Sequence, residues 1–187
     1  MIALSFMQVF ALDFPIDAQK NAQAHNNQGV LYMRERNYFS AIQEFKIAIA
    51  INPYHQTTAV YFNNLGCAYL ELAKIQNEHG IPKEWGDFGA YAQMSFEDAI
   101  KQDVMKLSYY QNIVDSFELQ GTLNKELKKY QKDSNKNPFS NIVVALIYVK
   151  QNKIRNAQII LDDFMTENPD LIINSSLKSY LKSLDED

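Results

Sequence analysis

The sequence predicts an all-α protein built from repeated helical hairpins, and three observations support this fold class. First, only six glycines and five prolines occur in 187 residues, so few turns interrupt the chain. Second, apolar side chains recur at steps of three and four, which places them on one face of an α-helix. Third, one pattern of small and aromatic residues returns along the chain, which indicates stacked copies of a single unit.

The clearest copy of this unit lies between Gly29 and Pro53. Its marker residues are Gly29, Tyr32, Ala41, Phe45, Ala48 and Pro53. A turn at Glu35-Arg36-Asn37 divides the copy into two short helices, and the proline ends the second. Inside a helix, glycine costs about 1 kcal/mol relative to alanine. We therefore expect Gly29 to be where the two helices approach most closely.

Three further copies depart from the pattern in different ways. The second copy uses Gly66, Tyr69, Ala92, Phe96 and Ala99. Its last three markers lie further along the chain than in the first copy, which predicts an insertion near residues 75–89. The third has Glu126 and Asp133 where alanine is expected, beside Val114, Phe117, Tyr130 and Pro138. The fourth uses Ala145, Tyr148, Ala157, Leu161, Phe164 and Pro169.

These markers resemble those of the tetratricopeptide repeat (TPR), a helix-turn-helix unit of about 34 residues. The resemblance covers residues 22–171, divided into 22–55, 59–106 with its insertion, 107–137 and 138–171. It implies an α-α superhelix of about four hairpins, with the first helix of each hairpin lining a concave groove. It also implies a scaffold that binds proteins or peptides.

The ends of the chain differ from this array. Residues 1–21 form an apolar leader, in which Val9-Phe10-Ala11 resembles a signal-peptide cleavage site although no basic residue precedes it. We interpret it as a truncated signal peptide or as the leader of a cytoplasmic protein, so exported (periplasmic) and cytoplasmic locations stay equally open. The first helix of the fourth repeat, at residues 139–149, is apolar nearly all round, and residues 172–187 are predicted to cap it. The alternative is an open apolar pocket for a partner helix or a second copy.

Helical spacing and the family resemblance together nominate the groove-facing residues. Asn27, Asn64 and Asn112 each stand two residues before the glycine site of their repeat and predict a row of amides that can grip a peptide backbone. Asn26, Asn63, Gln111 and Arg34 complete the predicted peptide-binding set. The alternative reading of the asparagines is that they bond to a neighbouring helix.

The charges of the predicted groove bear on its ligand. Glu71, Asp115 and Glu118 outnumber Arg34 there, which favours a neutral or basic ligand over an acidic one. Some TPR domains clamp the C-terminal carboxylate of a chaperone peptide with Lys or Arg at set groove sites. Only Asn64 agrees with that pattern here, because the other sites hold Asn26, Val30, Ser108 and Asn112.

The insertion carries a second candidate surface. Trp85, Phe88 and Tyr91 would form a docking loop if exposed, since aromatic residues dominate interface hot spots. The alternative, which we favour from the sequence, is that Trp85 folds back over the end of its own hairpin.

Other classes of function find no support in the sequence. The three histidines and one cysteine fit no metal-site spacing, and we predict no catalytic residue, metal or cofactor. A net charge of -4 without runs of Lys and Arg argues against nucleic acid, and no apolar run is long enough to span a membrane. We therefore predict a protein-interaction scaffold rather than an enzyme. The alternative is an assembly factor, in the cell envelope or elsewhere, that acts by oligomerisation.

Overall fold

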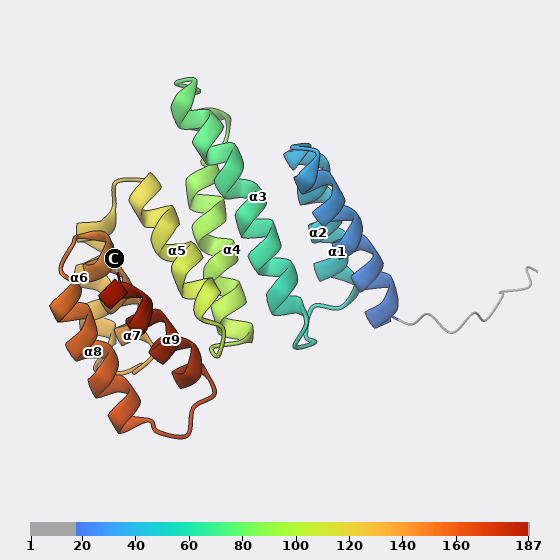
Figure 1. Ribbon diagram of the computed structural model, residues 1–187. Helices are drawn as coiled ribbons and strands as arrows, with labels where there is room; N and C mark the ends of the chain where they lie inside the picture. The colour runs from blue at the N-terminus through green and yellow to red at the C-terminus, as the bar shows by residue number, and fades with distance from the viewer. Residues whose placement is uncertain (1–17, 187) are drawn as a thin grey trace, which may run out of the picture.

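The structure is a computed structural model in which residues 18–186 are described, and its regular structure there is helical (Figure 1). The predicted all-α class is confirmed. In order, the elements are α1 (Ala18–Arg34), α2 (Tyr38–Ile51), α3 (Thr58–Glu78), the short 3-10 helix η1 (Lys83–Trp85), α4 (Phe88–Gln102), α5 (Leu107–Leu119), α6 (Leu123–Asp133), α7 (Ser140–Lys150), α8 (Ile154–Glu167) and α9 (Ile173–Glu186). The predicted apolar leader lies outside the described residues up to residue 17, and residues 18–21 belong to α1.

Successive helices pack as pairs, and the pairs stack along the chain. α1 packs on α2, α3 on α4 and α7 on α8, while α2–α3, α4–α5 and α6–α7 join neighbouring pairs. Figure 1 shows the pairs following one another from α1 at one side to α8 at the other. This is the helical repeat superhelix that the sequence predicts.

Two close contacts explain the glycines of the repeat pattern. A Cβ atom added at Gly29 would lie 2.5 Å from Cε1 of Phe45, and one at Gly66 would lie 2.5 Å from Cε1 of Phe96. Both rings are fully buried. The second hairpin therefore builds the same contact as the first, although its insertion separates the two partners in sequence.

The insertion is ordered by a buried glutamine. Gln76 lies near the end of α3, and its Nε2 donates hydrogen bonds to the carbonyl oxygens of Pro82 (3.3 Å) and Gly86 (2.8 Å). Gly86 has φ +137°, a conformation that side chains with a Cβ rarely adopt. Asp87 then caps α4 by accepting a hydrogen bond from the backbone N–H of Ala90 at 3.1 Å.

The C-terminal half holds the largest core. Ile142–Ile147, six consecutive residues of α7, are all buried, as the apolar sequence of this helix predicts. Ile173 and Leu177 of α9 are fully buried in the same cluster, and α9 contacts both α5 and α8. The inner face of α9 therefore covers part of the apolar fourth repeat.

Candidate functional site

The predicted peptide-binding amides lie on three first helices that are neighbours in space. We call the surface formed by Asn26 and Asn27 of α1, Asn63 and Asn64 of α3, and Gln111 and Asn112 of α5 the amide face. Contacts between α1 and α3 and between α3 and α5 bring these helices side by side (Figure 1). At the equivalent positions of α7 the chain has Ile142 and Val143, which are buried, so the amides end at α5.

Two hydrogen bonds on the amide face connect successive repeats. Nδ2 of Asn64 donates to Oδ1 of Asn26 at 2.8 Å, and Nδ2 of Asn112 donates to Oδ1 of Asn63 at 2.8 Å. Asn26 and Asn63 occupy equivalent positions in the first and second repeats, and Asn64 and Asn112 do so in the second and third. The same two positions are therefore bonded at both junctions between repeats. Asn64 and Asn112 therefore each bond to a neighbouring helix, which is the alternative that the sequence left open. Each uses one amide N–H for this bond.

The remaining predicted residues of this set are placed differently. Asn27 is exposed, and its Oδ1 accepts a hydrogen bond from Nε2 of Gln23 on the same helix at 2.8 Å. Arg34 is exposed at the end of α1, and Gln111 is half-buried on α5. The structure thus brings the amides together on one face, while Arg34 stands at its margin.

A hollow of about 290 Å³ adjoins the amide face where α9 crosses the array. Gln111, Asn112 and Asp115 of α5 line it together with Lys150 of α7 and Tyr180 of α9. Sequence reasoning missed Lys150 and Tyr180. The spacing of residues within one repeat does not reveal that α9 lies against α5, so no signal in the sequence could have found Tyr180.

Lysine side chains offset the acidic residues that the sequence places in the groove. Nζ of Lys150 lies 2.8 Å from Oδ1 of Asp115 and 2.8 Å from Oε2 of Glu118. Partial burial lowers the pKa of Lys150, but the hydrogen bonds to both carboxylates outweigh this and raise the pKa above its ordinary value. Glu71 is paired with Lys74 in the same way. Lys150 offsets one of the two charges of Asp115 and Glu118, and Lys74 offsets that of Glu71, so the acidic excess of the groove is smaller than the sequence alone indicates.

Cys67 lies beneath the amide face. Its Sγ is 3.7 Å from Nδ2 of Asn112 and 3.9 Å from Nδ2 of Asn63. Burial, followed by the negative charge of Glu71, raises the pKa of this thiol to about 11. The side chain is accordingly a neutral packing residue at physiological pH rather than a reactive thiolate.

The insertion presents its tryptophan to solvent. Trp85 is 78% exposed, so the favoured expectation that it folds back over its hairpin is wrong. Phe88 packs between Phe39 and Tyr91, with ring centroids 6.2 Å and 6.4 Å away, and is half-buried. The tryptophan projects because Pro82 and Gly86, on either side of η1, are both bonded to Gln76, which holds the base of the loop.

Two kinds of feature are missing from the described part of the chain. No three His, Cys, Asp or Glu side chains there are grouped so that they could hold a metal ion. None of its helices combines the length and apolar character needed to cross a bilayer.

Comparisons with known proteins concern the fold. No family model and no curated protein matches the chain. One similar solved structure is the first TPR of Spaghetti (RPAP3) bound to the HSP90 peptide SRMEEVD, with 16% sequence identity and a TM-score of 0.48 over 77% of this chain and 95% of that one. Another is Pseudomonas aeruginosa PilF, with 16% identity and a TM-score of 0.49 over 88% and 68%. A third is TTC0263, a thermophilic TPR protein of Thermus thermophilus, with 15% identity and a TM-score of 0.38 over 86% and 98%.

The repeat contacts within the chain carry the assignment of its fold. Helices pack in successive pairs, and in the first two pairs a glycine of the first helix receives a fully buried phenylalanine ring of the second. The described residues therefore form a TPR-like helical repeat fold.

Proposed function

We propose that the protein is an interaction scaffold whose amide face binds an extended peptide segment of a partner protein. The observation that carries this proposal is the unused hydrogen-bonding capacity of three asparagines. Within residues 18–186, Nδ2 of Asn27 and Oδ1 of Asn64 and Asn112 have no hydrogen-bond partner. An extended backbone offers carbonyl acceptors and N–H donors that suit such a series.

The structural bonds between repeats favour this function rather than compete with it. Because Asn64 and Asn112 are each held by a hydrogen bond to the preceding repeat, their free carbonyl oxygens are fixed before a ligand arrives, and little ordering cost falls on the scaffold. Each new hydrogen bond would contribute only about 0.5–1.5 kcal/mol, so several must act together. Helix α9 limits the available length to the surface of α1, α3 and α5.

The hollow beside Lys150 supplies a place for one ligand side chain. Asp115 and Lys150 give it both signs of charge, and Gln111 adds an amide. We therefore propose a polar side chain for this position. The exposed Trp85 loop is a candidate second contact for the same partner, because an exposed tryptophan is a typical interface anchor.

The test is selection of a random peptide library displayed on phage against the wild-type chain. Selected peptides are then measured by fluorescence anisotropy with the double variant Asn27→Arg/Gln111→Arg, which places two long cationic side chains on the amide face. The matched control is Gln43→Arg/Asn156→Arg, which makes the same two changes at exposed positions of α2 and α8.

We expect the selected peptides to lose at least about tenfold in affinity with the amide-face variant, equivalent to about 1.4 kcal/mol, and nothing with the control. Equal binding to the wild type and both double variants would overturn the amide face as the site. A loss with Trp85→Ala alone would transfer the site to the insertion.

A further inference from the structure

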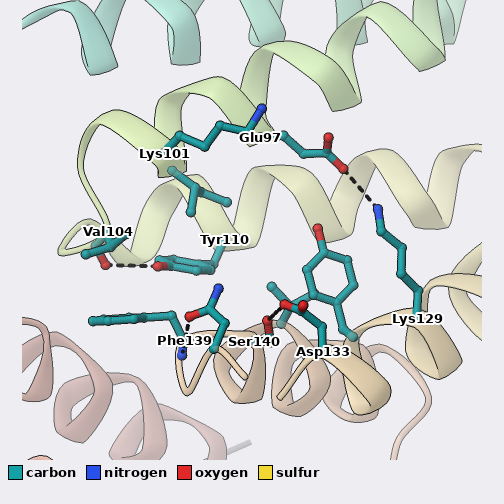
Figure 2. A pocket seen from close by; sticks show the side chains of 12 residues that line it. Glu97, Lys101, Val104, Tyr110, Lys129, Asp133, Phe139 and Ser140 are labelled. Carbon is teal, nitrogen blue, oxygen red and sulfur yellow. Dashed lines mark hydrogen bonds and ion pairs between the residues drawn. The ribbon is translucent and has the colours of Figure 1, made fainter. Parts of the chain in front are cut away.

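A second concavity lies between the second helices of two repeats, and none of its lining residues belongs to the amide face. It is a cleft of about 260 Å³ between α4 and α6, closed at one end by the start of α7 (Figure 2). Its aromatic and aliphatic lining consists of Ile100, Val104, Tyr110, Tyr130, Phe139 and Val143. Charged side chains, among them Lys101 and Lys129, stand at its rim, where both are exposed.

The cleft arises from the departures of the third repeat from the common pattern. Glu126 and Asp133 occupy the two positions of α6 where the first repeat has Ala41 and Ala48, and α6 packs less extensively on α5 than α2 does on α1. Asp133 instead turns to the start of α7, where it accepts a hydrogen bond from Oγ of Ser140 (Figure 2). The opening is thus held by a specific contact at its base.

The floor of the cleft suits a flat apolar group. Tyr110 and Val143 are almost completely buried within the protein and yet line the cleft, which shows that it reaches the core. The rings of Tyr110, Tyr130 and Phe139 provide aromatic surface from three different helix ends. Aromatic groups pair with one another in stacked or edge-on arrangements that add to the free energy of simple burial.

Most polar side chains of the cleft already have partners. Glu97 pairs with Lys129 at 3.2 Å and Lys101 with Asp98 at 2.8 Å. The hydroxyl of Tyr110 donates to the carbonyl oxygen of Val104 at 3.0 Å (Figure 2). The hydroxyl of Tyr130 has no hydrogen-bond partner among residues 18–186. Burial, together with the nearby charge of Glu97, raises the pKa of Tyr130, so this hydroxyl keeps its proton and is an available donor.

We propose that this cleft is a second binding site, independent of the amide face, for a neutral aromatic ring that carries an oxygen acceptor. The ring would lie against Tyr110, Phe139 and Val143, and its oxygen would accept a hydrogen bond from the hydroxyl of Tyr130. A tyrosine side chain of a partner and a small free phenol share this chemistry. The volume is slightly below the range of about 300–1,000 Å³ typical of small-molecule sites, which favours a single ring over a larger cofactor.

The probe for this site is p-cresol, titrated into the full chain carrying ¹³C-labelled isoleucine and valine methyl groups. We expect shifts confined to Ile100, Val104 and Val143, the labelled residues that line the cleft. 4-Methylcyclohexanol, which lacks the aromatic ring, and 4-methylbenzoate, which adds a charge, should each bind more weakly. Absence of shifts at these methyl groups, or equal binding of all three compounds, would overturn the proposal.

Two variants assign the interaction to its residues. Tyr130→Phe keeps the ring and removes the hydroxyl, so p-cresol should bind about two- to tenfold more weakly, the worth of one neutral hydrogen bond. Tyr54→Phe, the same change at a side chain that is 92% exposed, should leave binding unchanged. The methyl spectrum of each variant shows that the fold is retained. Unaltered affinity in Tyr130→Phe would contradict the assigned hydrogen bond.

A third measurement distinguishes a tyrosine side chain of a partner from a small free phenol as the origin of the bound ring. The tripeptide acetyl-Gly-Tyr-Gly-amide and its phenylalanine counterpart are titrated under the same conditions. Tighter binding of the tyrosine peptide than of p-cresol supports a side chain of a partner protein as the occupant. Binding of p-cresol with exclusion of both peptides supports a small free phenol.

Discussion

At the scale of single residues, asparagines at equivalent positions of the repeats make different hydrogen bonds, because their surroundings differ. Asn27 is exposed and bonded only within α1, whereas Asn64 crosses to Asn26 on the preceding repeat. Asn26 is only 5% exposed, so its carbonyl oxygen depends on Asn64 for a donor. A buried polar atom that loses its partner costs more than the bond itself contributes.

We therefore expect Asn64→Ala to lower the free energy of unfolding by about 1–3 kcal/mol, and Asn27→Ala to change it by less than about 0.5 kcal/mol. Urea denaturation followed by circular dichroism measures both. In a double-mutant cycle, Asn26→Ala and Asn64→Ala should be strongly non-additive. Additive effects would show that the 2.8 Å bond is not an energetic link between the repeats.

Cys67 yields a prediction about pH. Its pKa is raised from 9.0 to about 11, so the folded chain keeps the thiol proton between these values while the unfolded chain releases it. The free energy of unfolding should therefore fall as pH rises from 9 to 11, and fall less steeply in Cys67→Ala. Denaturation at several pH values measures the difference in slope. Parallel slopes in the two proteins would mean that the thiol titrates alike in both states.

At the scale of elements, the close packing of the first two hairpins depends on glycines that have no Cβ. The ring of Phe45 occupies the space that a Cβ on Gly29 would need, and Phe96 does the same at Gly66. The contact between Gly66 and Phe96 forms despite the insertion. Gln76 bonds to the insertion and Asp87 caps α4, so α4 starts where it can pack along α3.

Gly29→Ala tests that contact. Alanine gains about 1 kcal/mol of helix propensity, but forcing a fully buried ring to move costs about 1–3 kcal/mol, so we expect a net loss of stability. Ala24→Gly, at an exposed position of the same helix, measures the propensity term alone. Thermal unfolding reports both variants. A rise in the melting temperature of Gly29→Ala would show that Phe45 yields without cost.

The start of the last helix and the residue before it offer a matched pair of adjacent isoleucines. Ile173 is fully buried, whereas Ile172 is 81% exposed. Ile173→Ala should lower the free energy of unfolding by about 2–5 kcal/mol, because it leaves a cavity in the C-terminal core. Ile172→Ala should change it by no more than about 0.5 kcal/mol. Similar values for both, from urea denaturation, would show that α9 does not dock as described.

At the scale of the whole molecule, the array has one strongly apolar end and covers it with its own chain. The apolar helix α7 is enclosed by α5, α6, α8 and the buried side of α9, and the outer side of α9 carries Ser175, Ser176, Lys178, Ser179 and Lys182, which are exposed. Such a polar outer face is what the end of a helical array needs.

We accordingly expect the chain to be a monomer of 21.6 kDa whose mass, measured by light scattering, does not change with concentration. Removal of residues 171–187 should cause aggregation, because it uncovers the core that Ile173 and Leu177 complete. A stable oligomer of the intact chain would instead support the alternative that the protein acts in assembly.

How far the sequence reaches is shown by Gly29, Gly66 and the apolar segment around Ile142–Ile147. Their spacing predicts the hairpins and the buried α7, because helical periodicity and the exclusion of a Cβ are local properties that recur in each repeat. The same spacing places Asn26, Asn63 and Asn112 on one face. It does not say which of them bond to each other, since that depends on the distance between helices far apart in sequence.

The sequence by itself determined the repeat fold and the face on which the candidate site lies. Only the tertiary structure decided the pairing of Asn26 with Asn64, the ion pairs of Lys150 with Asp115 and Glu118, and the exposure of Trp85. It also decided the cleft beside Tyr130, which lies between α4 and α6. The physical reason is common to all four: they depend on contacts of a helix with another helix or with a loop, whereas periodicity reports only how one helix is divided between core and solvent.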